Sequence, residues 1–127
     1  MKMVKIAFAS EENRGLDSRL SHHFGRCPYY VFVEIEDGEI INVETKENPY
    51  FSNHVPGAVP QFIASEGANI IIAGGMGPRA LELFRRLNVQ PITGAIGKVR
   101  EALTDYLSGR MRGAEPCDYR KGVSYGT

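Results

Sequence analysis

The sequence predicts an α/β protein built on a mixed five-stranded sheet, with the element order βββαβαβα. In the second half of the chain, short apolar runs alternate with helical patterns, which is typical of parallel βαβ units. In the first half, two runs are joined by Asp37-Gly38, a strong hairpin signal. Residues 10–28 show no sustained helical period, and parallel neighbours need a crossover of roughly a dozen residues, usually helical. The second strand is therefore predicted to run antiparallel to the first.

The 127 residues are enough for one domain with its own core, which we assign to residues 1–109. The apolar pattern stops at Arg110, so residues 110–127 are expected to form a mobile C-terminal tail. The net charge is zero, so the chain lacks the excess of basic residues that is typical of nucleic-acid-binding proteins. No apolar run is long enough to cross a bilayer, and acidic residues follow the N-terminus too early for a secretory signal. We therefore expect a cytoplasmic protein that binds neither nucleic acid nor membranes.

Three strands are expected in the first half of the chain. Val4–Ala9 is a short apolar run with β-forming residues, and Tyr30–Glu36 alternates between apolar and polar positions. After the hairpin turn, Glu39–Lys46 returns as the third strand. The segment between the first two strands contains glycine, aspartate and serine, and is predicted to be a long loop.

The second half begins with a helix over about residues 58–66, in which Val59, Phe62 and Ile63 stand at i, i+3 and i+4. Gly67 is placed to cap its C-terminal end. Asn69–Ala73 is apolar on both faces, which is typical of a central strand in a parallel sheet.

Two further helices enclose the last strand. Pro78 suits the first turn of the second helix, and Val89–Thr93 is the fifth strand. Gly109 ends the third helix. The apolar positions of these helices keep helical spacing: Ala80, Leu83, Phe84 and Leu87 in the second, and Val99, Ala102, Leu103 and Tyr106 in the third.

The predicted strand directions place four loops at one edge of the sheet: residues 10–28, 47–57, 74–78 and 93–98. In open α/β sheets, ligands bind at this carboxyl edge. The side chains that we expect within reach of a single cleft are His22, His23, Arg26, Cys27, His54, Arg79 and Lys98.

A glycine-rich turn follows the fourth strand and opens a helix. The pattern Gly75-x-Gly77-x-x-Ala80 matches the fingerprint of dinucleotide sites. However, Pro78 removes one N–H donor and no acidic residue ends the next strand, which favours a tight turn without a dinucleotide. The N–H groups at such a helix start nevertheless suit an anionic ligand.

Groups that could hold a metal occur in two of these loops. His22 and His23 are adjacent, Cys27 follows them, and His54 lies in the facing loop. None shows the paired spacing of zinc sites, so structural or solvent-exposed roles remain the alternative. Cys27 and Cys117 form neither a disulfide framework nor a C-x-x-C pair, and we expect free thiols.

Three stretches together resemble the dinitrogenase iron–molybdenum cofactor biosynthesis family. They are SHHFGRCPYYVFVEIEDG, IIIAGGMGPRALELF and GKVREALTDYLSG, and the resemblance covers about residues 3–112. It implies a three-layer α/β/α, ribonuclease H-like fold with a mixed five-stranded sheet whose second strand is antiparallel. This agrees with the strand directions derived above.

The resemblance also implies a non-catalytic carrier that transiently binds an anionic iron–sulfur or iron–molybdenum-type cofactor, or a precursor. A cofactor-assembly or acceptor protein is then a further partner. His23-Phe24-Gly25-Arg26 matches the family's HFGR element, and Gly74–Arg79 matches its glycine turn. The cofactor-binding residues carried over in this way are His23, Arg26, Gly74, Gly75, Gly77 and Arg79, with His23 as the metal ligand. Cys27, where the family frequently has alanine, is our own candidate for a second metal ligand, since thiolate sulfur suits iron–sulfur species.

Two other functions stay open at this stage. The glycine turns allow a nucleotide- or phosphate-binding regulatory domain. A ribonuclease H-like fold suggests a metal-dependent phosphoesterase or nuclease, but such enzymes need an acidic residue in the first strand, and VKIAFA has none. Glu11 and Glu12 directly after that strand are the nearest candidates.

Overall fold

Five strands form one mixed sheet, in the order β3-β2-β1-β4-β5, in the computed structural model, which describes residues 3–53 and 55–109. The strands are β1 (Met3–Ser10), β2 (Tyr29–Glu36), β3 (Glu39–Glu47), β4 (Ile70–Ile72) and β5 (Gln90–Ile92). Strand β1 pairs antiparallel with β2 and parallel with β4. Strands β2 and β3 are antiparallel, and β4 and β5 are parallel. The predicted direction of the second strand is confirmed.

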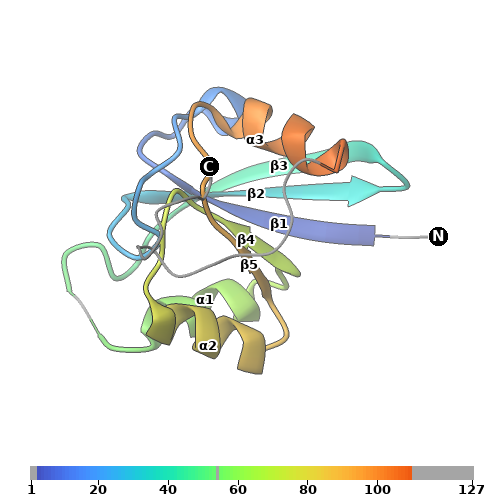
Figure 1. The fold of residues 1–127 in the computed structure, drawn as a ribbon. Coiled ribbons are helices and arrows are strands. Elements are labelled where there is room, and N and C mark those ends of the chain that lie inside the picture. The colour runs from blue at the N-terminus through green and yellow to red at the C-terminus, as the bar shows by residue number, and fades with distance from the viewer. Residues whose placement is uncertain (1–2, 54, 110–127) are drawn as a thin grey trace.

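Helices cover both faces of this sheet (Figure 1). Helices α1 (Ala58–Ser65) and α2 (Pro78–Arg86) lie on one face, and α3 (Val99–Leu107) lies on the other. The expected three-layer α/β/α arrangement is therefore present. Among the described residues, the one element that the sequence did not predict is a short 3-10 helix, η1 (Gly15–Asp17), inside the long loop after β1.

The alternation of side chains along the inner strands supplies two separate cores. In β1, Ala7 and Ala9 belong to the cluster beneath α1 and α2, whereas Ile6 and Phe8 belong to the cluster beneath α3. Strand β4 divides its three isoleucines in the same way, with Ile71 on the α1 and α2 side. Both faces of these strands are buried, which explains their continuous apolar sequences.

Two predicted turns have the backbone conformation that their residues favour. Asp37 and Gly38 have φ of 52° and 86°, and this left-handed pair is what a two-residue hairpin turn needs. Gly67 has φ of 87° and its N–H donates to the carbonyl of Ala64, so it ends α1 as expected.

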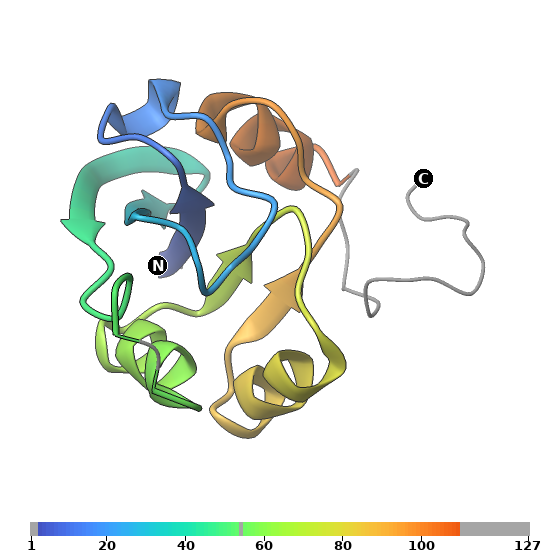
Figure 2. The ribbon, with the colours of Figure 1, turned by 90° about the vertical axis from the view of Figure 1, so that its left-hand side faces the viewer.

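The carboxyl ends of β1, β3, β4 and β5 meet at one edge of the sheet, as predicted. Figure 2 looks onto this edge, where the loop after β1 crosses the middle between α3 above and the helices α1 and α2 below. The expected tail, residues 110–127, lies outside the described residues, as do His54 and Cys117. Within the described part of the chain, no helix has the length and apolarity needed to cross a membrane.

Replacing Ile71 by alanine tests the buried position of β4. Ile71 is fully buried between β1, β5 and the helices, so Ile71→Ala is expected to lower the free energy of unfolding by about 2–5 kcal/mol. The matched control is Ile41→Ala in β3, where the side chain is half exposed and the change is expected within about 0.5 kcal/mol. Urea unfolding followed by circular dichroism measures both, and equal losses would contradict this core assignment.

Candidate functional site

A cleft of about 800 Å³ opens at the carboxyl edge of the sheet, between the first turns of α1 and α2. Its walls come from residues 22–26 after β1, from residues 55–60 around the start of α1, and from residues 75–86 of the glycine turn and α2. Pockets of roughly 300–1,000 Å³ hold small molecules and cofactors. Three of the four loops that the strand directions bring together thus form one hollow.

Positive charge and imidazole groups surround this cleft. His22, His23 and Arg26 line it from the first loop, and Arg79 lines it from the start of α2. All four side chains are exposed. In the part of the chain that the structure describes, neither Arg26 nor Arg79 has an ion-pair partner. Their two charges are therefore available to a bound anion.

A third arginine in the cleft has an acidic neighbour. The Nη2 atom of Arg86 lies 2.9 Å from Oε2 of Glu82, one turn earlier on α2, and both residues line the cleft. This exposed pair neutralises itself locally and adds little to stability. The electrostatic character of the cleft is set by the two unpaired arginines.

The deeper lining is apolar. Met76 is buried, while Phe24 is half buried and its ring packs edge-on against Phe84 of α2, with ring centroids 5.5 Å apart. Val59 of α1 and Leu83 of α2 complete this surface. A ligand in the cleft would therefore contact polarizable apolar groups below and cationic groups at the rim.

The loop that carries the two histidines is fixed to the sheet by its own backbone. The N–H of Ser21 donates to the carbonyl of Ala9 in β1, and the carbonyl of Ser21 accepts from the N–H of Gly74, just after β4. A Cβ atom at Gly74 would lie only 2.8 Å from Cα of His22. Gly74 therefore does not line the cleft but permits this close approach, which differs from its expected role as a cofactor-binding residue.

The buried side chain of Ser21 holds the next turn. Its Oγ accepts a hydrogen bond of 3.1 Å from the N–H of His23. This local bond fixes the backbone of His23 while its imidazole stays exposed at the cleft.

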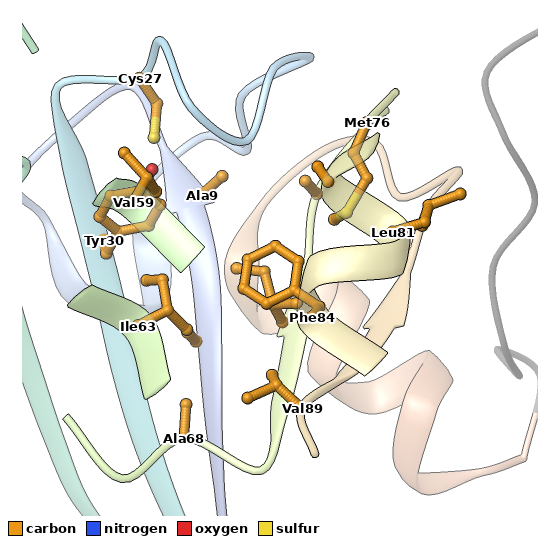
Figure 3. Packing of buried hydrophobic residues seen from close by; sticks show 14 of the residues in the cluster. Ala9, Cys27, Tyr30, Val59, Ile63, Ala68, Met76, Leu81, Phe84 and Val89 are labelled. Carbon is orange, nitrogen blue, oxygen red and sulfur yellow. The ribbon is translucent and has the colours of Figure 1, made fainter. Parts of the chain in front are cut away.

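Cys27 is not brought to the cleft. Its side chain is fully buried, and Figure 3 shows its sulfur pointing down into the cluster that contains Tyr30 and Val59. The thiol donates to the carbonyls of Tyr29 and Phe24, at 3.2 and 3.4 Å. Burial raises the pKa of Cys27 from 9.0 to about 11, which keeps the thiol protonated at neutral pH. The expected placement of Cys27 as a thiolate ligand in the cleft is therefore corrected.

Lys98 also differs from expectation. It pairs as an isolated bridge with Arg19, and the adjacent carbonyl of Gly97 accepts from the N–H of Leu20. These bonds hold residues 93–98 against the η1 loop, on the α3 side of the sheet, so this fourth loop does not line the cleft. Strand directions fix which edge a loop occupies, but not which face of the sheet it turns toward.

Several lining residues were missed from the sequence. Leu83 and Arg86 follow the predicted Arg79 at i+4 and i+7 on α2, a spacing that marks one helix face and was readable in advance. Met76 and Val59 gave no such signal, since apolar residues beside helix starts usually belong to a core. Glu11 and Glu12 do not line the cleft. Within residues 3–53 and 55–109, no three His, Cys, Asp or Glu side chains gather where they could hold a metal ion.

Comparison with known proteins gives consistent matches. The model of the family described as dinitrogenase iron-molybdenum cofactor matches residues 2–109. The uncharacterised protein MJ0580 of Methanocaldococcus jannaschii is 35% identical over 113 residues, covering 87% of this chain and 92% of that protein. The crystal structure of PH0822 superposes with a TM-score of 0.77 at 36% identity, over 87% of this chain and 96% of that one. The apo form of the orange protein from Desulfovibrio gigas gives a TM-score of 0.78 at 27% identity, over 91% and 96%.

Two alanine substitutions in the glycine turn test the fixed position of the histidine loop. Gly74→Ala is expected to displace Ser21 and His22 and to lower the free energy of unfolding by about 1–3 kcal/mol, because the new methyl group would overlap their backbone. Gly77→Ala is the matched control, since no atom lies within 4 Å of its added Cβ. Amide NMR shifts of His22 and His23, with urea unfolding, measure both; identical shifts in the two variants would contradict the contact.

The buried thiol of Cys27 predicts a loss of stability at alkaline pH. Its pKa is about 11 when folded and near 9.0 when unfolded, so the stabilisation present below pH 9.0 is lost as pH rises toward 11. Between about pH 8.5 and 10.5 the free energy of unfolding should fall by about 2 kcal/mol more in the wild type than in Cys27→Ala. Parallel pH profiles from urea unfolding would refute the buried, protonated thiol.

Proposed function

This chain belongs to the dinitrogenase iron-molybdenum cofactor family, and from that premise we propose that its cleft binds an anionic iron–sulfur or iron–molybdenum-type cofactor, or a precursor of one. The protein acts as a non-catalytic carrier, and the cofactor is its cargo. A cofactor-assembly or acceptor protein exchanges this cargo with it.

The observation that carries the proposal is that Arg26, from the loop after β1, and Arg79, from the first turn of α2, line the same cleft without acidic partners among the described side chains. A metal–sulfur cofactor is a bulky anion, and two guanidinium groups offset its charge through charge-assisted hydrogen bonds. The apolar surface around Met76 and Leu83 suits the soft, weakly hydrated sulfur atoms of such a cofactor. Charge at the rim and apolar contact below favour this kind of cargo over a small hydrated ion.

His23 is the proposed metal anchor. Its backbone is fixed through Ser21, and its exposed imidazole faces the cleft, where it can bind an open metal position of the cargo. Attachment through one imidazole and several ionic contacts leaves the cargo exchangeable, as a carrier requires. The similar structure of the orange protein is that of its apo form, which fits a fold whose cargo is exchangeable.

A second function is favoured by one feature of the cleft. Gly75 and Gly77 line it at the start of α2, where N–H groups at a helix N-terminus suit a phosphate. A regulatory domain that binds a nucleotide or phosphate is therefore the competing candidate, and the experiment below separates the two.

Anaerobic loading tests the proposed function. The purified protein is mixed with a reconstituted [4Fe–4S] cluster, and visible absorption of the protein fraction is followed after gel filtration. Wild-type protein is expected to retain the cluster, and Arg26→Ala and Arg79→Ala are each expected to weaken retention by about tenfold, because each removes a charge-assisted contact. His23→Ala is expected to weaken it as well.

Arg14→Ala provides the matched control, since it removes the same charge from an exposed residue that does not line the cleft. Equal losses of cluster retention in Arg14→Ala and Arg79→Ala would show that retention depends on net charge alone, and would contradict the proposed binding site. A raised melting temperature with nucleotides or phosphate, but no retained cluster, would favour the competing function.

A further inference from the structure

A buried asparagine lies behind the wall of the cleft that carries the histidines. Asn48 follows β3 directly and is 5% exposed, and no sequence pattern singles it out. A buried amide is costly unless its donors and acceptor are all satisfied. Its hydrogen-bond partners therefore show which segments of the chain it holds in place.

The side chain of Asn48 joins two separate loops. Its Nδ2 donates to the carbonyls of Cys27, at 2.9 Å, and Gly25, at 3.2 Å. Its Oδ1 accepts from the N–H of Tyr50 at 2.9 Å. Its backbone N–H donates to the carbonyl of Pro28. These partners fix the orientation of the amide, because only the NH₂ group can serve the two carbonyls.

The two carbonyls that Asn48 binds flank Arg26 on either side. The preceding carbonyl, of Phe24, accepts from the hydroxyl of buried Tyr30. The carbonyls of residues 24, 25 and 27 therefore face buried donors behind the loop, whereas the side chain of Arg26 lines the cleft in front of it. A carbonyl dipole directed into the cleft would repel an anion and compete for the guanidinium groups.

We propose that Asn48 is a positioning residue for cargo binding: its amide turns the carbonyls on both sides of Arg26 away from the cleft and so directs the arginine toward the bound anion. This role rests on the proposed function, since it acts on the same cleft. Asn48 itself touches no cargo. It works through the segment 24–28.

The test compares Asn48→Ala with Asn69→Ala. Asn69 is the matched control because its Oδ1 accepts from the N–H of Lys5 and so also joins two segments, but at the opposite edge of the sheet. Two properties are measured well below the melting temperature of each variant: retention of the reconstituted [4Fe–4S] cluster, and hydrogen–deuterium exchange of residues 22–28 without cluster.

Asn48→Ala is expected to weaken cluster retention by about tenfold and to speed exchange in residues 22–28 by at least about tenfold, since two carbonyls lose their donor. Asn69→Ala is expected to match the wild type in both. A merely structural role of Asn48 would lower the melting temperature of Asn48→Ala but leave its cluster retention equal to that of the wild type, and that result overturns the proposal.

The two measurements also separate this inference from the proposed function. If wild-type protein retains no cluster, the cargo assignment fails, and exchange in residues 22–28 alone decides whether Asn48 positions the loop: faster exchange in Asn48→Ala supports it, and exchange equal to that of Asn69→Ala overturns it. Should Asn48→Ala not fold, Asn48→Ser carries the same test, because its shorter side chain does not reach both carbonyls.

Discussion

The backbone contact between the loop after β1 and the turn after β4 is the constraint on which the cleft depends. Ser21 bonds to Ala9 on one side and to Gly74 on the other, so the histidine loop is held against the middle of the sheet. A side chain at position 74 would collide with His22. Without this close approach, the segment that carries His23 and Arg26 would have no fixed position relative to α2.

Next to this contact, buried polar groups hold the negative carbonyl oxygens of the loop apart from its cationic side chains. Behind the loop, the hydroxyl of Tyr30, the amide of Asn48 and the thiol of Cys27 donate to its backbone carbonyls. The cationic side chains remain on the side of the cleft. Desolvated donors that are fully bonded specify one conformation, because any other arrangement would leave them without partners. The cationic surface of the cleft is thus formed without a ligand, and this preorganisation would lower the entropic cost of the proposed anion binding.

Much of the fold was predictable, because local patterns carried it. Three local patterns each favour a single type of secondary structure. They are the two-residue turn at Asp37-Gly38, the uninterrupted apolar run before Gly74 and the apolar stripe of α2. The absence of a helical crossover then fixed the direction of β2, and the family resemblance over nearly the whole chain agreed with it. The short helix η1 was missed, because three residues show no periodicity.

The sequence by itself determined which loops share the carboxyl edge, and thereby brought His22, His23, Arg26 and Arg79 to one cleft. It did not determine which way each side chain faces. Cys27 lies four residues from His23 yet points into the core, and the loop with Lys98 turns to the opposite face of the sheet. Only the tertiary structure decides these cases, because burial and hydrogen-bond partners come from other parts of the chain. Tyr30 and Asn48, for example, both bond to the turn at residues 24–27.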